Sequence, residues 1–308
     1  MFDPFSLKEF EKMACDVTKT FWTKQFLNNE VKIVETDHML FLLEKQELYP
    51  KYEHLIQFKD AENVKLVIRQ RDNIQTVQCL KLLPNLERLG LEGNQIKDLQ
   101  PIGELIKLIR LNLEQNRIKI LQPLAGLCNL KVLNLHCNQI QDISCLEGLK
   151  ELEEIDLSTN KITDIQALQK LTKLSFVAVS HNNIKNLQPL ASLNLRTLQA
   201  ESNLIVDISS LKSLVNVTEL ILDDNKIKNI QAISCMKSVQ TLSLAKNNLS
   251  SLLPLSHLTN IQFLNLQSCS ITDLTPLCNM QSLEKLRLAR NKITDVSPLR
   301  IKTLGTGS

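Results

Sequence analysis

Apolar residues recur in this chain with a period of 22 residues. In residues 152–173 they form a set that also contains one asparagine: Leu152, Ile155, Leu157, Asn160, Ile162, Ile165, Leu168 and Leu171. The fourth and sixth places of each repeat point the same way from an extended chain, so we expect a short strand that buries both. The remaining length leaves room for one turn of 3₁₀ or short helix. The pattern predicts an α/β solenoid with a parallel sheet.

The repeat extends over residues 64–302. A degenerate copy, 64–85, has Arg69 and Asp72 where a core leucine and the asparagine are expected. Ten better copies begin at Leu86, Leu108, Leu130, Leu152, Leu174, Leu195, Val217, Val239, Ile261 and Leu283. The copy from Leu174 has 21 residues, with one lost near Asn194. Lys302 stands at a core position of the last copy, so this end is completed by another segment or partner, or the chain is a fragment. Residues 303–308 read as a tail, natural or introduced by cloning.

Two polar or rigid places repeat as well. Nine copies carry asparagine at the ninth place, namely Asn94, Asn116, Asn138, Asn160, Asn182, Asn203, Asn225, Asn247 and Asn291, and Cys269 replaces it in the other. The amide both donates and accepts, so we expect it to satisfy the backbone where the strand ends. The sixteenth place is often proline, as in Pro101, Pro123, Pro189, Pro254, Pro276 and Pro298. Proline removes a backbone donor and restricts φ there.

Residues 1–63 do not repeat. They contain Trp22, both tyrosines and seven of the nine phenylalanines. Asp3-Pro4 is a typical helix start, and Met39 to Leu48 has apolar spacing that favours a second helix. Val31 and Ile33 indicate a strand or an extended link. We interpret the segment as a helical N-terminal cap that covers the open end of the solenoid, with an independent recognition or effector module as the alternative.

Charge and cysteine content restrict the class of protein. The net charge of +3 is too balanced to favour nucleic acid or an anionic membrane. No apolar run is long enough to span a membrane, and no signal segment follows Met1. The eight cysteines are not clustered as in a disulfide-stapled cap. We therefore expect a cytoplasmic monomer, with the nucleus as the alternative compartment.

The third, fifth and seventh places of each copy should line the concave face. Three of these residues are large and apolar where solvent is expected: Phe176, Ile221 and Phe263. Acidic residues surround them, and basic residues follow near the end of the chain. The candidate partner-binding residues are Phe176, Ile221, Phe263, Glu154, Asp156, Glu201, Glu219, Asp223, Asp224, Arg287 and Arg290.

No motif indicates catalysis or a cofactor. Asp223, Asp224 and Glu201 lack the glycine-bearing loop of a calcium site. His136-Cys137 and His181 are separated by two strands, which is too far for a catalytic pair. Basic residues are not interleaved with aromatics as in nucleic-acid-binding surfaces. We predict no metal, no cofactor, no nucleic-acid partner and no enzymatic activity.

The pattern L-x-x-L-x-L-x-x-N-x-L resembles leucine-rich repeats. Phrases such as Ile271-Thr272-Asp273-Leu274-Thr275-Pro276-Leu277 are similar to the 22-residue subclass in bacterial internalins and in the leucine-rich regulatory subunit of protein phosphatase one. The resemblance implies a horseshoe-shaped scaffold that binds a protein on its concave face. It leaves two alternatives, a phosphatase regulatory subunit and a bacterial effector or multidomain enzyme whose activity lies in residues 1–63 or in a further C-terminal domain.

Overall fold

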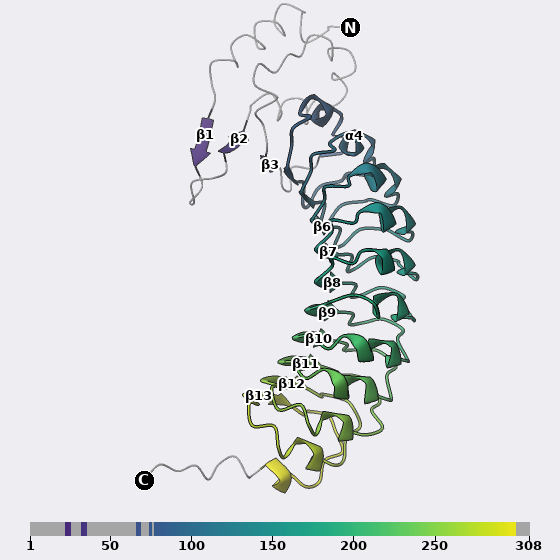
Figure 1. Ribbon diagram of the computed structural model, residues 1–308, viewed down its shortest axis with the longest axis vertical. Helices are drawn as coiled ribbons and strands as arrows, with labels where there is room; N and C mark the ends of the chain where they lie inside the picture. The colour runs from purple at the N-terminus through teal and green to yellow at the C-terminus, as the bar shows by residue number, and fades with distance from the viewer. Residues whose placement is uncertain (1–21, 26–31, 36–65, 69–73, 76, 300–308) are drawn as a thin grey trace, which may run out of the picture. The chain divides into compact units, whose positions relative to one another are not determined.

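The computed structural model describes residues 22–25, 32–35, 66–68, 74–75 and 77–299 (Figure 1). The chain divides into two compact units, residues 1–139 and 140–308, and each is described separately. Within both units the same element order recurs, a three-residue strand followed by a short helix. Figure 1 shows the short helices on the side of each unit opposite the strands. The predicted strand-and-turn repeat is therefore confirmed.

The first unit contains two separate sheets. Strands β1 (Trp22–Gln25) and β2 (Lys32–Glu35) pair antiparallel with each other. The parallel strands of the repeats are β3 (Leu66–Ile68), β4 (Arg88–Gly90), β5 (Arg110–Asn112) and β6 (Val132–Asn134). The helices of this unit are η3 (Gln78–Leu82), α4 (Gln100–Gly103) and η4 (Gln122–Gly126).

The second unit continues the parallel arrangement. Its strands are β7 (Glu154–Asp156), β8 (Phe176–Ala178), β9 (Thr197–Gln199), β10 (Glu219–Ile221), β11 (Thr241–Ser243), β12 (Phe263–Asn265) and β13 (Lys285–Arg287). Its 3₁₀ helices are η5 (Ser144–Gly148), η6 (Gln166–Lys170), η7 (Gln188–Leu190), η8 (Ser209–Ser213), η9 (Gln231–Cys235), η10 (Leu253–Leu255) and η11 (Thr275–Leu277). Each strand pairs with the next in the chain at the same repeat position.

The apolar framework packs as the period predicts. In the Leu152 repeat, every framework side chain from Leu152 to Leu171 is at most 1% exposed, apart from the asparagine. Proline occupies the first turn of α4, η4, η7, η10 and η11, where its missing N–H leaves no helical bond unmade. Gly103 in α4 has a packing reason, because an added Cβ would lie 2.5 Å from the carbonyl oxygen of Pro123.

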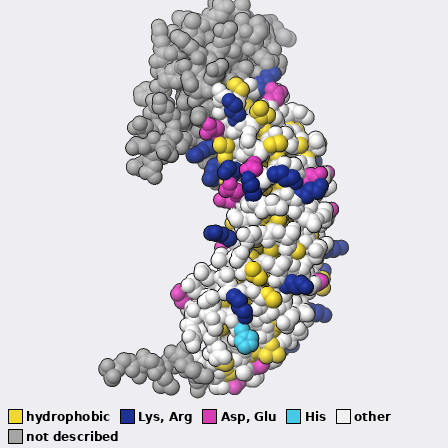
Figure 2. Space-filling view, viewed as in Figure 1, with side chains coloured by type: hydrophobic (Ala, Val, Ile, Leu, Met, Phe, Trp, Pro, Cys, Tyr) yellow, Lys and Arg dark blue, Asp and Glu magenta, His cyan; other side chains and the backbone are white. Residues whose placement is uncertain are grey.

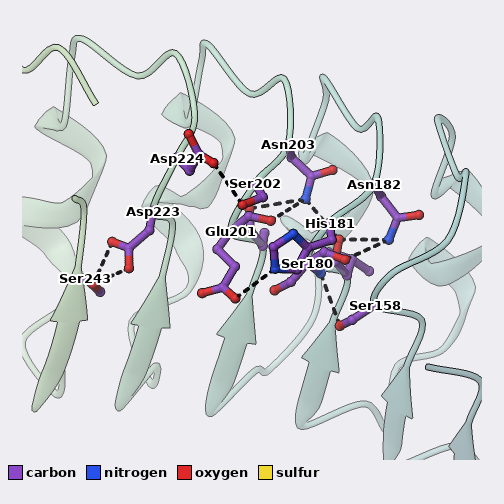
Figure 3. Close-up of polar contacts among 12 residues, drawn as sticks. Ser158, Ser180, His181, Asn182, Glu201, Ser202, Asn203, Asp223, Asp224 and Ser243 are labelled. Atoms are coloured by element: carbon purple, nitrogen blue, oxygen red, sulfur yellow. Dashed lines mark hydrogen bonds and ion pairs between the residues drawn. The ribbon is translucent and has the colours of Figure 1, made fainter. Parts of the chain in front are cut away.

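The asparagine column has the role that the sequence predicts. The Asn182 Nδ2 donates to the carbonyls of Leu157, Val179 and Ser180 at 3.0, 3.1 and 3.1 Å. Its Oδ1 accepts from the N–H of Ile162 at 2.9 Å. One buried amide therefore satisfies four backbone groups and joins two consecutive repeats (Figure 3).

The residue before each asparagine adopts a left-handed conformation, which is unusual for residues other than glycine. The set with positive φ at this eighth place is Gln115, Cys137, Thr159, His181, Ser202, Asp224, Lys246, Ser268 and Arg290, together with Gly93. The eighth residue therefore turns the chain away from the strand, and it cannot continue the alternation of the strand side chains.

The irregular copies behave in different ways. The degenerate first copy keeps its core, since Ile74, Val77, Leu80 and Leu83 are at most 2% exposed. The shortened Leu174 repeat preserves the register Phe176↔Thr197, so the deletion lies outside the strands. In the last copy, Leu283, Leu286 and Leu288 are only half-buried, unlike their counterparts.

The predicted helices of residues 1–63 lie outside the described residues, and β2 includes Ile33 of the predicted strand.

Candidate binding surface

The candidate residues of the second unit form rows across the sheet. The strand face is defined here as the side chains at the third, fifth and seventh places of the repeats from β7 to β13. Its third-place row runs Glu154, Phe176, Thr197, Glu219, Thr241, Phe263 and Lys285, and each member pairs with the next. Residues far apart in the chain are thus brought into one surface, with neighbouring strands about 4.8 Å apart.

The three apolar candidates are half-buried on this face, and they differ in their surroundings. The Phe263 ring is covered by two cations, with Lys285 Nζ and Arg287 Cζ at 5.7 and 5.3 Å from its centroid. Cation–π attraction stabilises such a stack. Phe176 instead pairs with Glu154 and Thr197, and Ile221 pairs with Gln199 and Ser243. Among the described residues, no cation–π contact occurs at the Phe176 ring, and Ile221 has polar neighbours on both sides in its row.

Several acidic candidates have an intramolecular partner, and Figure 3 shows those of Glu201, Asp223 and Asp224. Glu201 Oε1 lies 3.4 Å from His181 Nε2, and Glu219 Oε1 accepts from Gln199 Nε2 at 3.0 Å. Asp224 Oδ2 accepts from the Ser202 hydroxyl at 3.1 Å. His181 and Gln199 are not among the predicted partner-binding residues, although their neighbouring repeat positions would have indicated both contacts. These partners offset part of the repulsion between carboxylates.

Asp223 has a folding role that the sequence did not reveal. Its Oδ1 accepts from the Ser243 hydroxyl and from the N–H of Ala245, both at 2.6 Å. The Asn265 Nδ2 in turn donates to Ser243 Oγ at 2.9 Å. Burial raises the pKa of the Asp223 carboxyl above its usual range, while the two hydrogen bonds oppose that shift. This carboxylate joins three consecutive repeats and is less available to a partner.

Asp156 shows the commoner arrangement for a polar residue at the fifth place. Its Oδ1 accepts from the N–H of Ser158 in the same repeat at 2.8 Å. Asn112, Asn134 and Asn265 accept in the same way from the residue two positions later. Ser243 is too short to do so, and Asp223 from the preceding repeat caps Ala245 instead.

The remaining candidates separate into two groups. Glu154 and Arg287 lie on strands and are exposed. Asp224 and Arg290 lie at the eighth place with φ of 53° and 59°, in the turn after the strand. The structure therefore places them beside the strand face and not on it. Figure 2 shows basic, acidic and hydrophobic side chains interspersed over the visible surface.

Thiols and other side chains that can ligate a metal occur throughout the described part of the chain. No group of three His, Cys, Asp or Glu side chains among these residues is arranged to hold a metal ion. The described cysteines are free, and burial raises the pKa of the Cys145 and Cys269 thiols to about 11. Both thiols are protonated at neutral pH and are weak nucleophiles. Over the same residues, no helix has the length and apolar character needed to cross a bilayer.

Comparison with known proteins agrees with this architecture. The family model of leucine-rich repeats in two copies matches residues 84–126, 106–150, 128–170, 150–192 and 259–301. The structure of an internalin, InlF of Listeria monocytogenes, is 30% identical, with a TM-score of 0.77 over 79% of this chain and 72% of that one. Internalin C2 of the same organism is 34% identical, with a TM-score of 0.59 over 62% of this chain and 83% of that one.

A more distant structure shares the fold. The leucine-rich repeat protein LIC12759 of Leptospira interrogans is 24% identical, with a TM-score of 0.62, and the match covers 77% of this chain and 70% of that one. No curated protein matches the chain. The similarity to internalins that the repeat phrases predict is therefore confirmed.

Proposed function

The chain belongs to the leucine-rich repeat family, and on that premise we propose that it is a non-enzymatic scaffold that binds a partner protein on the strand face of residues 140–299. The fold supports a protein-interaction role in general. The observation that carries the finer proposal is the placement of Phe176 and Ile221, two large apolar residues that remain partly exposed on the strand face. Half-buried apolar residues within a polar surface are typical of interaction hot spots.

The charges around these two residues define the partner that fits. Glu154 beside Phe176 is exposed, and Glu219 and Glu201 are partly exposed. A partner with apolar side chains flanked by lysine or arginine complements this region. Such charge complementarity raises the association rate and makes it sensitive to salt. Arg287 and Lys285 provide the opposite charge at the other end of the surface.

We further propose that the protein is a monomer and that it works in a reducing compartment, either the cytoplasm or the nucleus. The described cysteines are free thiols, which supports this placement. That residues 1–63 form a helical cap remains a prediction.

A matched pair of variants tests the strand face. Phe176→Ala with Ile221→Ala removes both apolar groups, and Val215→Ala with Leu253→Ala removes two residues of the same unit that are 47% and 68% exposed away from the strands. Affinity capture from source cells should lose its partner with the first pair and retain it with the second. Truncation of a hot-spot side chain costs about 2 kcal/mol, so we expect binding to fall by well over tenfold.

The outcome separates the alternatives. Equal retention of partners by both double variants, with unchanged circular dichroism, would contradict strand-face binding. Recovery of a phosphatase catalytic subunit that depends on Phe176 and Ile221 would select the regulatory-subunit alternative. Asp223 is left intact in both variants because its removal would disturb the fold through Ser243 and Ala245.

A further inference from the structure

A basic hollow lies on the turns that follow β10, β11 and β12, outside the strand face. It has a volume of about 490 Å³ and is lined by Asn225, Lys226, Lys228, Lys246, Asn247, Asn248, Ser268 and Ser270. The lysines come from the eighth, tenth and twelfth places of two consecutive repeats. The sheet pairing holds these turns side by side, so three cations separated in the chain converge on one hollow.

These lysines form no close ion pairs with carboxylates among the described residues. Within the described part of the chain, Lys226, Lys228 and Lys246 form no ion pair within 4.0 Å, whereas Lys170 and Lys173 do so with Glu147 and Glu151. The acidic groups nearest in the repeat pattern are Asp223 and Asp224. Asp223 interacts electrostatically with Lys246 but accepts its hydrogen bonds from Ser243 and Ala245. The hollow therefore keeps an excess of positive charge.

The backbone at the hollow departs from the regular repeat. In the repeats that follow the Leu86 repeat, the tenth residue donates its N–H to the eleventh residue of the preceding repeat, as Lys226 does to Ile205 and Lys292 does to Ile271. Ser270 occupies this place with φ of 61°, and its N–H has no such bond. It is the only tenth-place residue among the described ones with positive φ. The departure provides a free N–H donor at an exposed residue that lines the hollow.

The hydrogen-bond donors that line the hollow suit a phosphate group. Three ammonium groups, the hydroxyls of Ser268 and Ser270, the Asn248 amide and the Ser270 N–H can all donate hydrogen bonds. A phosphomonoester carries about −1.5 to −2 charges at neutral pH and three acceptor oxygens, which matches several cations together with neutral donors. Lysine binds phosphate as a point charge, whereas arginine is favoured for two-point carboxylate recognition. No aromatic residue lines the hollow, so it offers no surface for stacking a base.

We propose that this basic hollow binds the phosphate group of a phosphorylated serine or threonine presented by a protein partner. The exposed side chains of Lys226, Lys228 and Lys246 at its rim suit a group that a protein surface presents from outside. Phosphorylation of the partner then adds a charge-assisted contact next to the strand face. The site is separate from Phe176 and Ile221, so it stands or fails independently of strand-face binding.

Nuclear magnetic resonance titration of the full chain tests the proposal. The probe is a short peptide with one phosphoserine, compared with its unphosphorylated form at constant ionic strength. We expect the phosphopeptide alone to produce saturable shifts of the Ser268 and Ser270 amide signals. Lys226→Gln with Lys246→Gln should weaken binding at least about tenfold, since two of the three cations are removed. Inorganic phosphate should shift the same signals with lower affinity.

Matched lysines provide the control. Lys161 occupies the tenth place of its repeat, as Lys226 does, and Lys185 occupies the twelfth, as Lys228 does; both lie outside the hollow in the same unit and are likewise exposed. Lys161→Gln with Lys185→Gln changes the net charge equally and should leave the affinity unchanged. Equal loss with both pairs would show only bulk charge attraction and overturn the proposal. Absence of saturable shifts at Ser268 and Ser270 would also overturn it.

Lipid vesicles provide the other competing source of phosphate. Phosphatidylcholine vesicles with and without phosphatidylserine are sedimented with the wild-type chain and the Lys226/Lys246 variant. We expect no binding that depends on these lysines. Sedimentation with the anionic vesicles that the variant loses, together with indifference to the phosphopeptide, would assign the hollow to a membrane surface instead.

Discussion

The Leu174 repeat and the Ile261 repeat share one fold, but they treat the ninth residue differently. In the Leu174 repeat, residues 174–194, Asn182 donates to three carbonyls and accepts the N–H of Ile162. In the Ile261 repeat, residues 261–282, Cys269 donates its thiol hydrogen to the Leu244 carbonyl at 3.0 Å, with a longer contact of 3.5 Å to Gln267. A thiol has one weak donor, whereas an amide has two donors and a strong acceptor.

The missing acceptor has a visible consequence. The N–H of Leu249 should donate to the ninth residue of the next repeat, as Ile162 does to Asn182, yet it has no hydrogen-bond partner among the described residues. The residue after Cys269 is Ser270. It has positive φ, and its N–H does not form the bond to the preceding repeat that the other tenth-place residues form. The comparison shows that the asparagine column holds each turn in place, and that the basic hollow lies where this column is interrupted.

The largest effect is expected from breaking the regular repeat. Asn182→Ala removes four hydrogen bonds and leaves buried backbone groups without partners. At about 0.5–1.5 kcal/mol per bond, the free energy of unfolding should fall by roughly 2–6 kcal/mol. Urea denaturation followed by circular dichroism measures the change. Amide hydrogen exchange at Ile162 should accelerate as well, which gives a local reading if the repeats do not unfold together.

The irregular repeat provides the matched control for that prediction. Cys269→Ala removes only the thiol contacts, so we expect a loss of about 1 kcal/mol. If Cys269→Ala destabilised the chain as much as Asn182→Ala, packing at the ninth place would dominate over hydrogen bonding.

The next effect comes from repairing the irregular repeat. Cys269→Asn restores an acceptor for Leu249, whose side chain is 7% exposed, and supplies a second donor. We expect the free energy of unfolding to rise by about 1 kcal/mol, with slower hydrogen exchange at the Leu249 amide. The exchange of Ile162, in the regular part of the same unit, serves as the internal reference. Unchanged exchange at Leu249 would mean that the asparagine side chain does not reach this N–H.

The framework could be predicted from the sequence because each part of it repeats. Leu157 and Asn160 occur in the same chemical context in many copies, so a period of 22 residues indicated both burial and hydrogen bonding. The pairing of neighbouring strands then placed Glu154, Phe176 and Glu219 in one row. Whether these residues bind a partner stays a prediction.

Features that depend on exceptions could not be predicted in the same way. Asp223 caps Ala245 across repeats only because Ser243 is too short to cap its own strand end. Asp224 and Arg290 were predicted to bind the partner together with the concave-face residues, but they lie in the left-handed turn beside the strand face. Lys226, Lys228 and Lys246 showed no common pattern in the sequence, because only the stacking of the turns brings them together. Non-periodic contacts therefore required the structure.

The smallest expected effect distinguishes the same two repeats at their thirteenth place. Asp273 in the Ile261 repeat accepts from the N–H of Thr275 at 2.8 Å, and Asn186 in the Leu174 repeat accepts from Gln188 at the same distance. Hydrogen bonds from the Thr275 side chain and backbone lower the pKa of the Asp273 carboxyl. A lowered pKa in the folded state means that Asp273 stabilises the fold above its unfolded pKa of about 3.9 and loses this contribution as the pH falls through the folded value.

Exchanging the two caps should exchange their pH dependence. Asp273→Asn keeps an acceptor for Thr275, so stability at neutral pH should change little, while the loss of stability below about pH 4 should become smaller. Asn186→Asp should add acid sensitivity to the Leu174 repeat. Urea denaturation of both variants at neutral and acid pH measures the difference, with Asp142 and Asp207 providing the same background in each protein. Identical pH profiles for the two variants would show that these exposed turn caps contribute to the fold through the geometry of the hydrogen bond and not through the charge of the carboxylate.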